Sequence, residues 1–150
     1  MAQGKAQHRY CTSVRWERER RGVLSSEGKP DLEVATPPEF KGHEGVWSPE
    51  DMLVGALETC IMLTFLYYAD RAGVELKSYQ SECEGTLQMG SGGMSFSDFT
   101  VQADITVAAE EQVEAAREAI GKAESACLIT RSLDGETSVT VEAEVAVRAD

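Results

Sequence analysis

Two kinds of apolar spacing divide this chain into elements. Apolar residues return every three or four positions over about 48–70 and 110–125, which predicts two amphipathic helices. Segments with strand patterns lie around them, and 23–25 with 32–34 flank a turn cluster to form a predicted hairpin. The other predicted strands cover 10–17, 76–89, 99–107 and 137–148. This order of strands and helices predicts one α+β domain over residues 1–150, in which 1–7 form a loose leader.

The first helix has a strong start signal. Ser48 suits the cap, Pro49 the first helical position, and Asp51 completes a pattern that resembles a capping box. An apolar stripe through Cys60 follows, so we expect a central helix buried on most sides with a thiol in its middle. The stripe consists of Leu53, Ala56 or Leu57, Cys60, Leu63 or Thr64, and Tyr67. Glu58 and Thr59 interrupt the run, which we therefore interpret as too short for a membrane span.

The second half of the chain predicts a hairpin, a helix and a last strand. The turn at 90–93 is not followed by a helix or a Lys, so it does not match a phosphate-binding loop. In the second helix, apolar residues spaced by three and four place Cys127 on the buried face. That face consists of Val113, Ala116, Ile120, Ala123 and Cys127.

Charge and cysteine usage narrow the classes of function. The formal net charge of −12 argues against partners that are nucleic acids or anionic membranes. The N-terminus is polar, so we expect no signal peptide, a cytoplasmic protein and reduced thiols. The four cysteines and two histidines lack the spacing of a zinc site, and we expect no metal. Buried cysteines are common as small apolar residues, and we interpret Cys11 and Cys83 in that way.

The two helix cysteines lie in motifs that resemble a known family. Ser48-Pro49-Glu50 comes ten positions before Cys60, and 123–129 carries Cys127 at the end of a later helix. These motifs and the order of elements resemble the OsmC/Ohr family of osmotically induced and organic hydroperoxide resistance proteins. The resemblance covers about 14–147 and implies antiparallel sheets around a long central helix, in an intertwined homodimer.

The resemblance also implies a stress-response thiol peroxidase. Cys60 would attack a small-molecule hydroperoxide and become a sulfenic acid, and Cys127 would resolve it as an intramolecular disulfide. Members of the family bind no metal or flavin. We therefore expect no bound cofactor and an external dithiol as the reductant, either a dihydrolipoyl group on a lipoylated protein or a small thiol.

The family activates its thiol with an Arg that is oriented by the Glu of the Pro-Glu motif. Glu50 matches that Glu, and the Ohr-type Arg-x-Gly loop matches Arg20-Arg21-Gly22, with Arg20 in the functional position. Strand parity agrees, since position 20 shares the face of Val14 and Trp16. Residues 38–41 hold no Arg where OsmC proteins have one, and a solvated charge run is the alternative interpretation of Arg20. Glu58 also departs from the family, although it points away from position 60 on a helix.

Glu50 and Cys60 are about 15 Å apart along a straight helix, which exceeds hydrogen-bond reach. Either Arg20 bridges part of this gap or a second subunit approaches the thiol, and the latter agrees with the homodimer. Three aromatic residues are candidates for an apolar substrate pocket, with core or interface packing as the alternative for each. These are Trp47, Phe40 and Tyr67.

Two other classes of function stay open. One is a non-catalytic dimer of this fold that binds a small apolar ligand, and the other is a redox sensor whose disulfide is a signal. A depressed pKa of Cys60 would favour the peroxidase over the binding protein.

Overall fold

The computed structural model describes residues 6–148, in which backbone contacts define two compact units. The N-terminal unit is Met1–Met52 and the C-terminal unit is Leu53–Asp150. The single-domain prediction stays a prediction, and most of the predicted leader lies outside the described residues.

The N-terminal unit contains a three-stranded antiparallel sheet in the order β1-β2-β3. The strands are β1 (Ser13–Arg18), β2 (Arg21–Ser25) and β3 (Leu32–Ala35), followed by the short helix η1 (Pro38–Phe40). The predicted hairpin is therefore confirmed as β2 and β3. Cys11 precedes β1 and is exposed, so its assignment to a buried strand position is wrong.

Helix α1 (Pro49–Arg71) begins with the predicted cap. The Asp51 N–H donates to Ser48 Oγ at 3.1 Å, and the Ser48 N–H donates to Asp51 Oδ2 at 3.0 Å. This reciprocal pair satisfies donors that the first helical turn leaves free, and Ser48 is 1% exposed. The helix ends where expected, because Gly73 follows with a φ of 71°.

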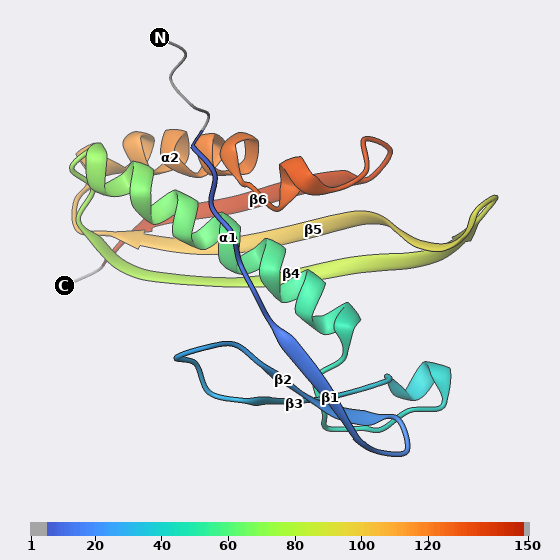
Figure 1. Cartoon of the computed structure of the whole chain (residues 1–150). Helices are drawn as coiled ribbons and strands as arrows, with labels where there is room; N and C mark the ends of the chain where they lie inside the picture. Colours follow the sequence, from blue (N-terminus) through green and yellow to red (C-terminus); the bar gives the residue numbers. More distant parts are fainter. Residues whose placement is uncertain (1–5, 149–150) are drawn as a thin grey trace, which may run out of the picture. The chain divides into compact units, whose positions relative to one another are not determined.

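The C-terminal unit is a three-stranded sheet with two helices (Figure 1). Strands β4 (Leu76–Gly90) and β5 (Gly93–Val107) form the predicted long antiparallel hairpin. After the short helix η2 (Glu110–Gln112), α2 (Val113–Ala126) connects β5 to β6 (Ser138–Val147), which pairs with β5 in parallel. The expectation of antiparallel sheets is therefore wrong for this pair, because a crossover helix connects the two strands. A second short helix, η3 (Thr130–Ser132), lies between α2 and β6.

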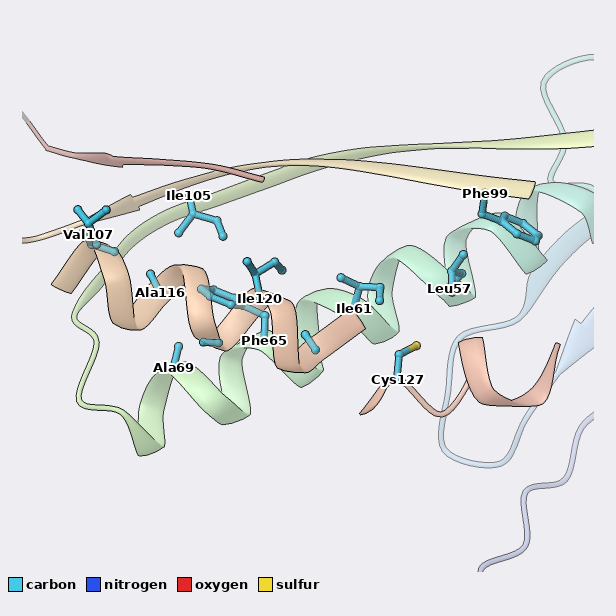
Figure 2. Close-up of a cluster of buried hydrophobic side chains, with 13 residues drawn as sticks. Leu57, Ile61, Phe65, Ala69, Phe99, Ile105, Val107, Ala116, Ile120 and Cys127 are labelled. Atoms are coloured by element: carbon cyan, nitrogen blue, oxygen red, sulfur yellow. The ribbon is translucent and has the colours of Figure 1, made fainter. Parts of the chain in front are cut away.

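The core of this unit lies where α1 and α2 pack against β5 (Figure 2). Alternate β5 residues from Phe99 to Val107 are buried, as their pattern predicted. On α1 the buried residues are Leu57, Ile61, Phe65 and Ala69. The predicted stripe was therefore displaced around the helix, since Leu63 and Tyr67 are 55% and 56% exposed.

Helix α1 is covered on one face within a single chain, so the prediction of burial on most sides is wrong for this chain. The expectation that the run is too short for a membrane is also wrong in its premise. The helix has 23 residues and a mean hydropathy of 1.6 over an 18-residue window, which by length and composition is enough to span one. Core helices of soluble proteins share this property, and α1 contributes four residues to the core.

Candidate functional site

The C-terminal unit brings two of the predicted site residues together. Cys60 is partly buried in the middle of α1, and Cys127 follows α2 with 0% of its surface exposed. The Cys127 side chain lies near Cys60, so that each thiol affects the pKa of the other. Figure 2 shows Cys127 in the segment after α2, among the side chains of the core cluster. Both thiols are free.

The surroundings of Cys60 favour its charged form. Burial alone would raise its pKa, but polar groups around the sulfur outweigh burial and lower the pKa below the usual thiol value. In order of effect these groups are the Cys127 thiol, the Ile129 N–H, the Thr64 hydroxyl and the Leu128 N–H. The Thr64 Oγ1 atom lies 3.9 Å from Cys60 Sγ, one helical turn further along α1.

The surroundings of Cys127 favour its neutral form. Burial raises its pKa, and so does the neighbouring Cys60 thiol. The Thr130 N–H, 3.4 Å from Cys127 Sγ, opposes this shift without reversing it. The pair therefore consists of one thiol that ionises easily and one that keeps its proton.

The end of α2 creates this arrangement. At Cys127 the backbone leaves the helix with φ −58° and ψ 121°, and the chain then turns. The Arg131 N–H closes the turn by donating to the Cys127 carbonyl oxygen at 3.1 Å. As a result, the Thr130 N–H lies 3.4 Å from Cys127 Sγ, and the main chain at Leu128 and Ile129 contributes to the lowered pKa of Cys60.

Glu58, which departs from the family pattern, does not act on the thiol pair. Its Oε1 atom accepts a hydrogen bond from Ser81 Oγ on β4 at 2.7 Å. Burial raises the pKa of Cys83 to about 11, and the charge of Glu58 contributes to this rise. Among the described residues, Glu58 is not one of the groups that shift the pKa of Cys60.

Arg20 and Glu50 belong to the N-terminal unit, where they do not form an ion pair within the described chain. Arg20 is exposed in the turn between β1 and β2, so its predicted strand parity does not apply. Its Nη1 atom donates to the Phe40 carbonyl oxygen at 2.8 Å, and it lines a hollow of about 320 Å³. Arg21 instead pairs with Glu33 at 2.9 Å.

The three aromatic candidates are at the surface. Trp47 and Phe40, in the N-terminal unit, are 54% and 40% exposed. Tyr67 lies on the uncovered side of α1, where Arg71 donates to its hydroxyl at 3.3 Å. The alternative interpretation, that these three side chains pack in the core of a single chain, is therefore wrong.

Sequence reasoning missed part of the site. Thr64 lies four residues after Cys60 and could have been found from helical spacing. The main-chain N–H groups of Leu128 and Ile129 carry no signal in side-chain identity. Across residues 6–148, no group of three His, Cys, Asp or Glu side chains is arranged to hold a metal ion.

Comparison with known proteins gives the family. The OsmC-like protein family matches residues 42–142. The uncharacterized protein YmaD of Bacillus subtilis is 28% identical over 144 residues, covering 93% of this chain and 96% of YmaD. An OsmC-like protein of unknown function from Vibrio cholerae has a TM-score of 0.83 at 21% identity, covering 92% of this chain and all of that one. For an organic hydroperoxide resistance protein OsmC from Legionella pneumophila, the TM-score is 0.70 at 20% identity, with coverage of 97% and 100%. The predicted α+β fold is thereby confirmed, and the chain belongs to the OsmC-like protein family.

Proposed function

We propose that this protein is a thiol-dependent peroxidase that reduces organic hydroperoxides. The observation that carries the proposal is the position of Cys60 against the core cluster that contains Cys127, where their surroundings shift the pKa values of the two thiols in opposite directions. The more acidic Cys60 is the nucleophile and Cys127 is the resolving residue. The Legionella relative is named for organic hydroperoxide resistance, which supports this choice of substrate.

The reaction balances with these two residues and an external dithiol. The Cys60 thiolate attacks the distal peroxide oxygen, the O–O bond breaks, and the alkoxide takes a proton from water to leave as an alcohol. Cys60 is now a sulfenic acid. The Cys127 sulfur attacks Cys60 Sγ, which forms the disulfide and releases water. A dithiol then gives two electrons and two protons to restore both thiols and becomes a disulfide itself.

In this proposal, dihydrolipoyl groups or small dithiols reduce the disulfide between Cys60 and Cys127. Both chemistries operate in a reducing compartment, so we place the protein in the cytoplasm. The resting thiols of Cys60 and Cys127 suit that environment.

Glu50 and Arg20 are the proposed activating residues. The Oε2 atom of Glu50 is buried and has no hydrogen-bond partner among the described residues. Because buried polar atoms normally have a partner, this supports a role for Glu50 in binding a cation. Arg20 is exposed and makes its hydrogen bond to a main-chain carbonyl, whereas Arg21 is engaged with Glu33. In the proposal Arg20, oriented by Glu50, polarises the peroxide.

A homodimer is the proposed assembly. Leu63, Leu66 and Tyr67 on the uncovered side of α1 are 55%, 36% and 56% exposed. A second copy of α1 would bury these side chains and could bring the partner's N-terminal unit to the thiol pair. Apolar residues around the thiol would also favour organic hydroperoxides over hydrogen peroxide.

The test is the consumption of cumene hydroperoxide with dihydrolipoamide or dithiothreitol. We expect Cys60→Ser to abolish turnover, and Cys127→Ser to stop it with a trapped sulfenic acid on Cys60. Cys83→Ser is the matched control, because Cys83 is a partly buried thiol of the same unit whose pKa is raised by burial and Glu58. It should turn over as the wild type does.

Two results would contradict the proposal. Wild-type protein that consumes no peroxide with either dithiol would favour the ligand-binding alternative. A disulfide that forms rapidly but that neither dithiol reduces would favour the redox sensor.

The dimer is tested by light scattering after size exclusion. Leu63→Glu should dissociate it, whereas Met94→Glu, at an exposed apolar position near the β4–β5 turn, should not. A monomeric wild-type protein would contradict this assembly.

A further inference from the structure

A hollow lies between α1 and β4 of the C-terminal unit. Its volume is about 370 Å³, which is within the range of small-molecule sites. The side chains that line it come from one flank of α1 and from three consecutive positions of β4. They are Glu58, Thr59, Met62, Tyr79, Gln80 and Ser81. Glu58 precedes Cys60 by two residues, so these two side chains point about 200° apart around the helix. The hollow is therefore separate from the thiol pair.

Glu58 gives this hollow a negative charge that the described chain does not neutralise. Its Oε1 atom accepts a hydrogen bond from Ser81 Oγ at 2.7 Å, and this contact holds the carboxylate against β4. Glu58 takes part in none of the ion pairs within residues 6–148. Burial raises the pKa of Cys83 and the charge of Glu58 adds to this rise, as expected for a carboxylate that has no cation beside it.

Tyr79 adds a buried hydroxyl without a partner. Tyr79 and Ser81 are two positions apart on β4, so their side chains share the face that packs against α1. The Tyr79 ring lies against Phe65 of the core, with 5.5 Å between the ring centroids. Its Oη atom is buried and has no hydrogen-bond partner in the described chain, because the Ser81 hydroxyl donates to Glu58 instead. Since buried polar atoms normally have a partner, this hydroxyl indicates a ligand group that completes the site.

We propose that the hollow binds a small organic cation that carries a primary ammonium group. An ammonium group has three N–H donors and no acceptor, so it can pair with the Glu58 carboxylate and also donate to the hydroxyl oxygen of Tyr79. Met62 offers a flexible apolar surface to a short carbon chain. The net charge of −12 favours the approach of cations. A metal ion is not supported, because no three His, Cys, Asp or Glu side chains of residues 6–148 are arranged to hold one.

The test is a titration of the wild-type protein with n-butylammonium chloride, followed by the amide NMR signals of Glu58, Gln80 and Ser81. We expect these signals to shift and to saturate. Two probes serve as controls, because n-butanol keeps the carbon chain without the charge, and tetramethylammonium chloride keeps the charge without N–H donors. Both should leave the signals unchanged at concentrations where n-butylammonium saturates them. A wild-type protein that does not respond to n-butylammonium, or that responds equally to tetramethylammonium, would overturn the proposal.

Glu58→Gln tests the carboxylate. This substitution keeps the shape of the side chain and removes its charge, so we expect n-butylammonium to bind about tenfold more weakly. Glu82→Gln is the matched control, because Glu82 is an exposed residue on the opposite face of β4, one position after Ser81. It removes the same charge and should bind the probe as the wild type does. Equal affinities of Glu58→Gln and Glu82→Gln would refute the site.

Tyr79→Phe tests the hydroxyl. The variant keeps the ring that packs on Phe65, and we expect n-butylammonium to bind about three- to tenfold more weakly. Because the Oη atom has no partner in the described chain, the same substitution should not lower the free energy of unfolding without the probe. An unchanged affinity, or a clear loss of stability, would contradict the assignment of this hydroxyl to a ligand. None of these measurements uses peroxide, so their outcome is independent of the proposed function.

Discussion

Cys127→Ala and Cys127→Ser separate the two roles proposed for Cys127, as a resolving cysteine and as a neighbour that lowers the pKa of Cys60. Both variants lose the disulfide, but serine keeps an O–H that can donate to Cys60, whereas alanine has no donor. Among the groups that lower the pKa of Cys60, the Cys127 thiol has the largest effect. We therefore expect Cys60 in Cys127→Ala to ionise less readily, and Cys60 in Cys127→Ser to stay close to the wild type.

The magnitude follows from the strength of the contact. A hydrogen bond to a charged group contributes about 1.5–3 kcal/mol, but S–H is a weak donor and Cys60 is only partly buried, so about 1–1.5 kcal/mol is the better figure. This corresponds to about a five- to tenfold lower thiolate fraction below the pKa of Cys60. Because Cys127 is fully buried, both substitutions should also cost about 1–2 kcal/mol of stability.

The assay is the pH dependence of Cys60 alkylation, measured on the Cys60 peptide at a temperature where all three proteins are folded. The lowered pKa of Cys60 means that the wild-type rate should rise and level off at a lower pH than for an unperturbed thiol. The profile of Cys127→Ala should move to higher pH. If Cys127→Ala reacts like the wild type, or if Cys127→Ser slows as much as Cys127→Ala, the donor role of Cys127 is refuted.

Three further predictions concern other parts of the chain. Glu58→Gln should lower the pKa of Cys83 from about 11, so Cys83 should alkylate faster at pH 9, and an unchanged rate would contradict the role of Glu58. Ser48→Ala should reduce the free energy of unfolding in urea by about 1–2 kcal/mol, because the Asp51 N–H loses the Ser48 hydroxyl as its acceptor and Asp51 Oδ2 loses the same hydroxyl as a donor; Asp31→Ala, away from the cap, is its control. Gly85→Ala should cost about 1–3 kcal/mol, since its Cβ would lie 2.9–3.0 Å from a valine methyl group and two phenylalanine rings. A stability equal to the wild type would show that these rings can move.

Local patterns predicted the elements well because their causes are local. The cap at Ser48, the stop near Gly73 and the alternation from Phe99 to Val107 each depend on residues within a few positions. The buried side of α1 was misplaced because that helix is apolar around much of its circumference. Where leucine, isoleucine and phenylalanine occur on several faces, periodicity alone does not say which face the sheet covers.

For the candidate site too, sequence reasoning found some of the residues and missed others. The family motif pointed to Cys60 and Cys127, and the structure places their side chains together. Arg20 could not be oriented from strand parity, because β1 ends at Arg18 and a turn follows. The donors at Leu128 and Ile129 were invisible for a different reason, since every residue except proline has the same N–H.

Selectivity among thiols follows from these local differences. A peroxide reacts with thiolates, so the cysteine whose charged form is best stabilised reacts first. Polar groups from α1 and the turn after α2 favour the charged form of Cys60, whereas burial and the charge of Glu58 keep Cys83 protonated at neutral pH. Glu58, which looked like an obstacle to peroxidase chemistry, thus acts on the thiol that should stay inert. In the proposed reaction Cys127, which lies near Cys60, would attack the oxidised Cys60, and the product would be a disulfide within the C-terminal unit.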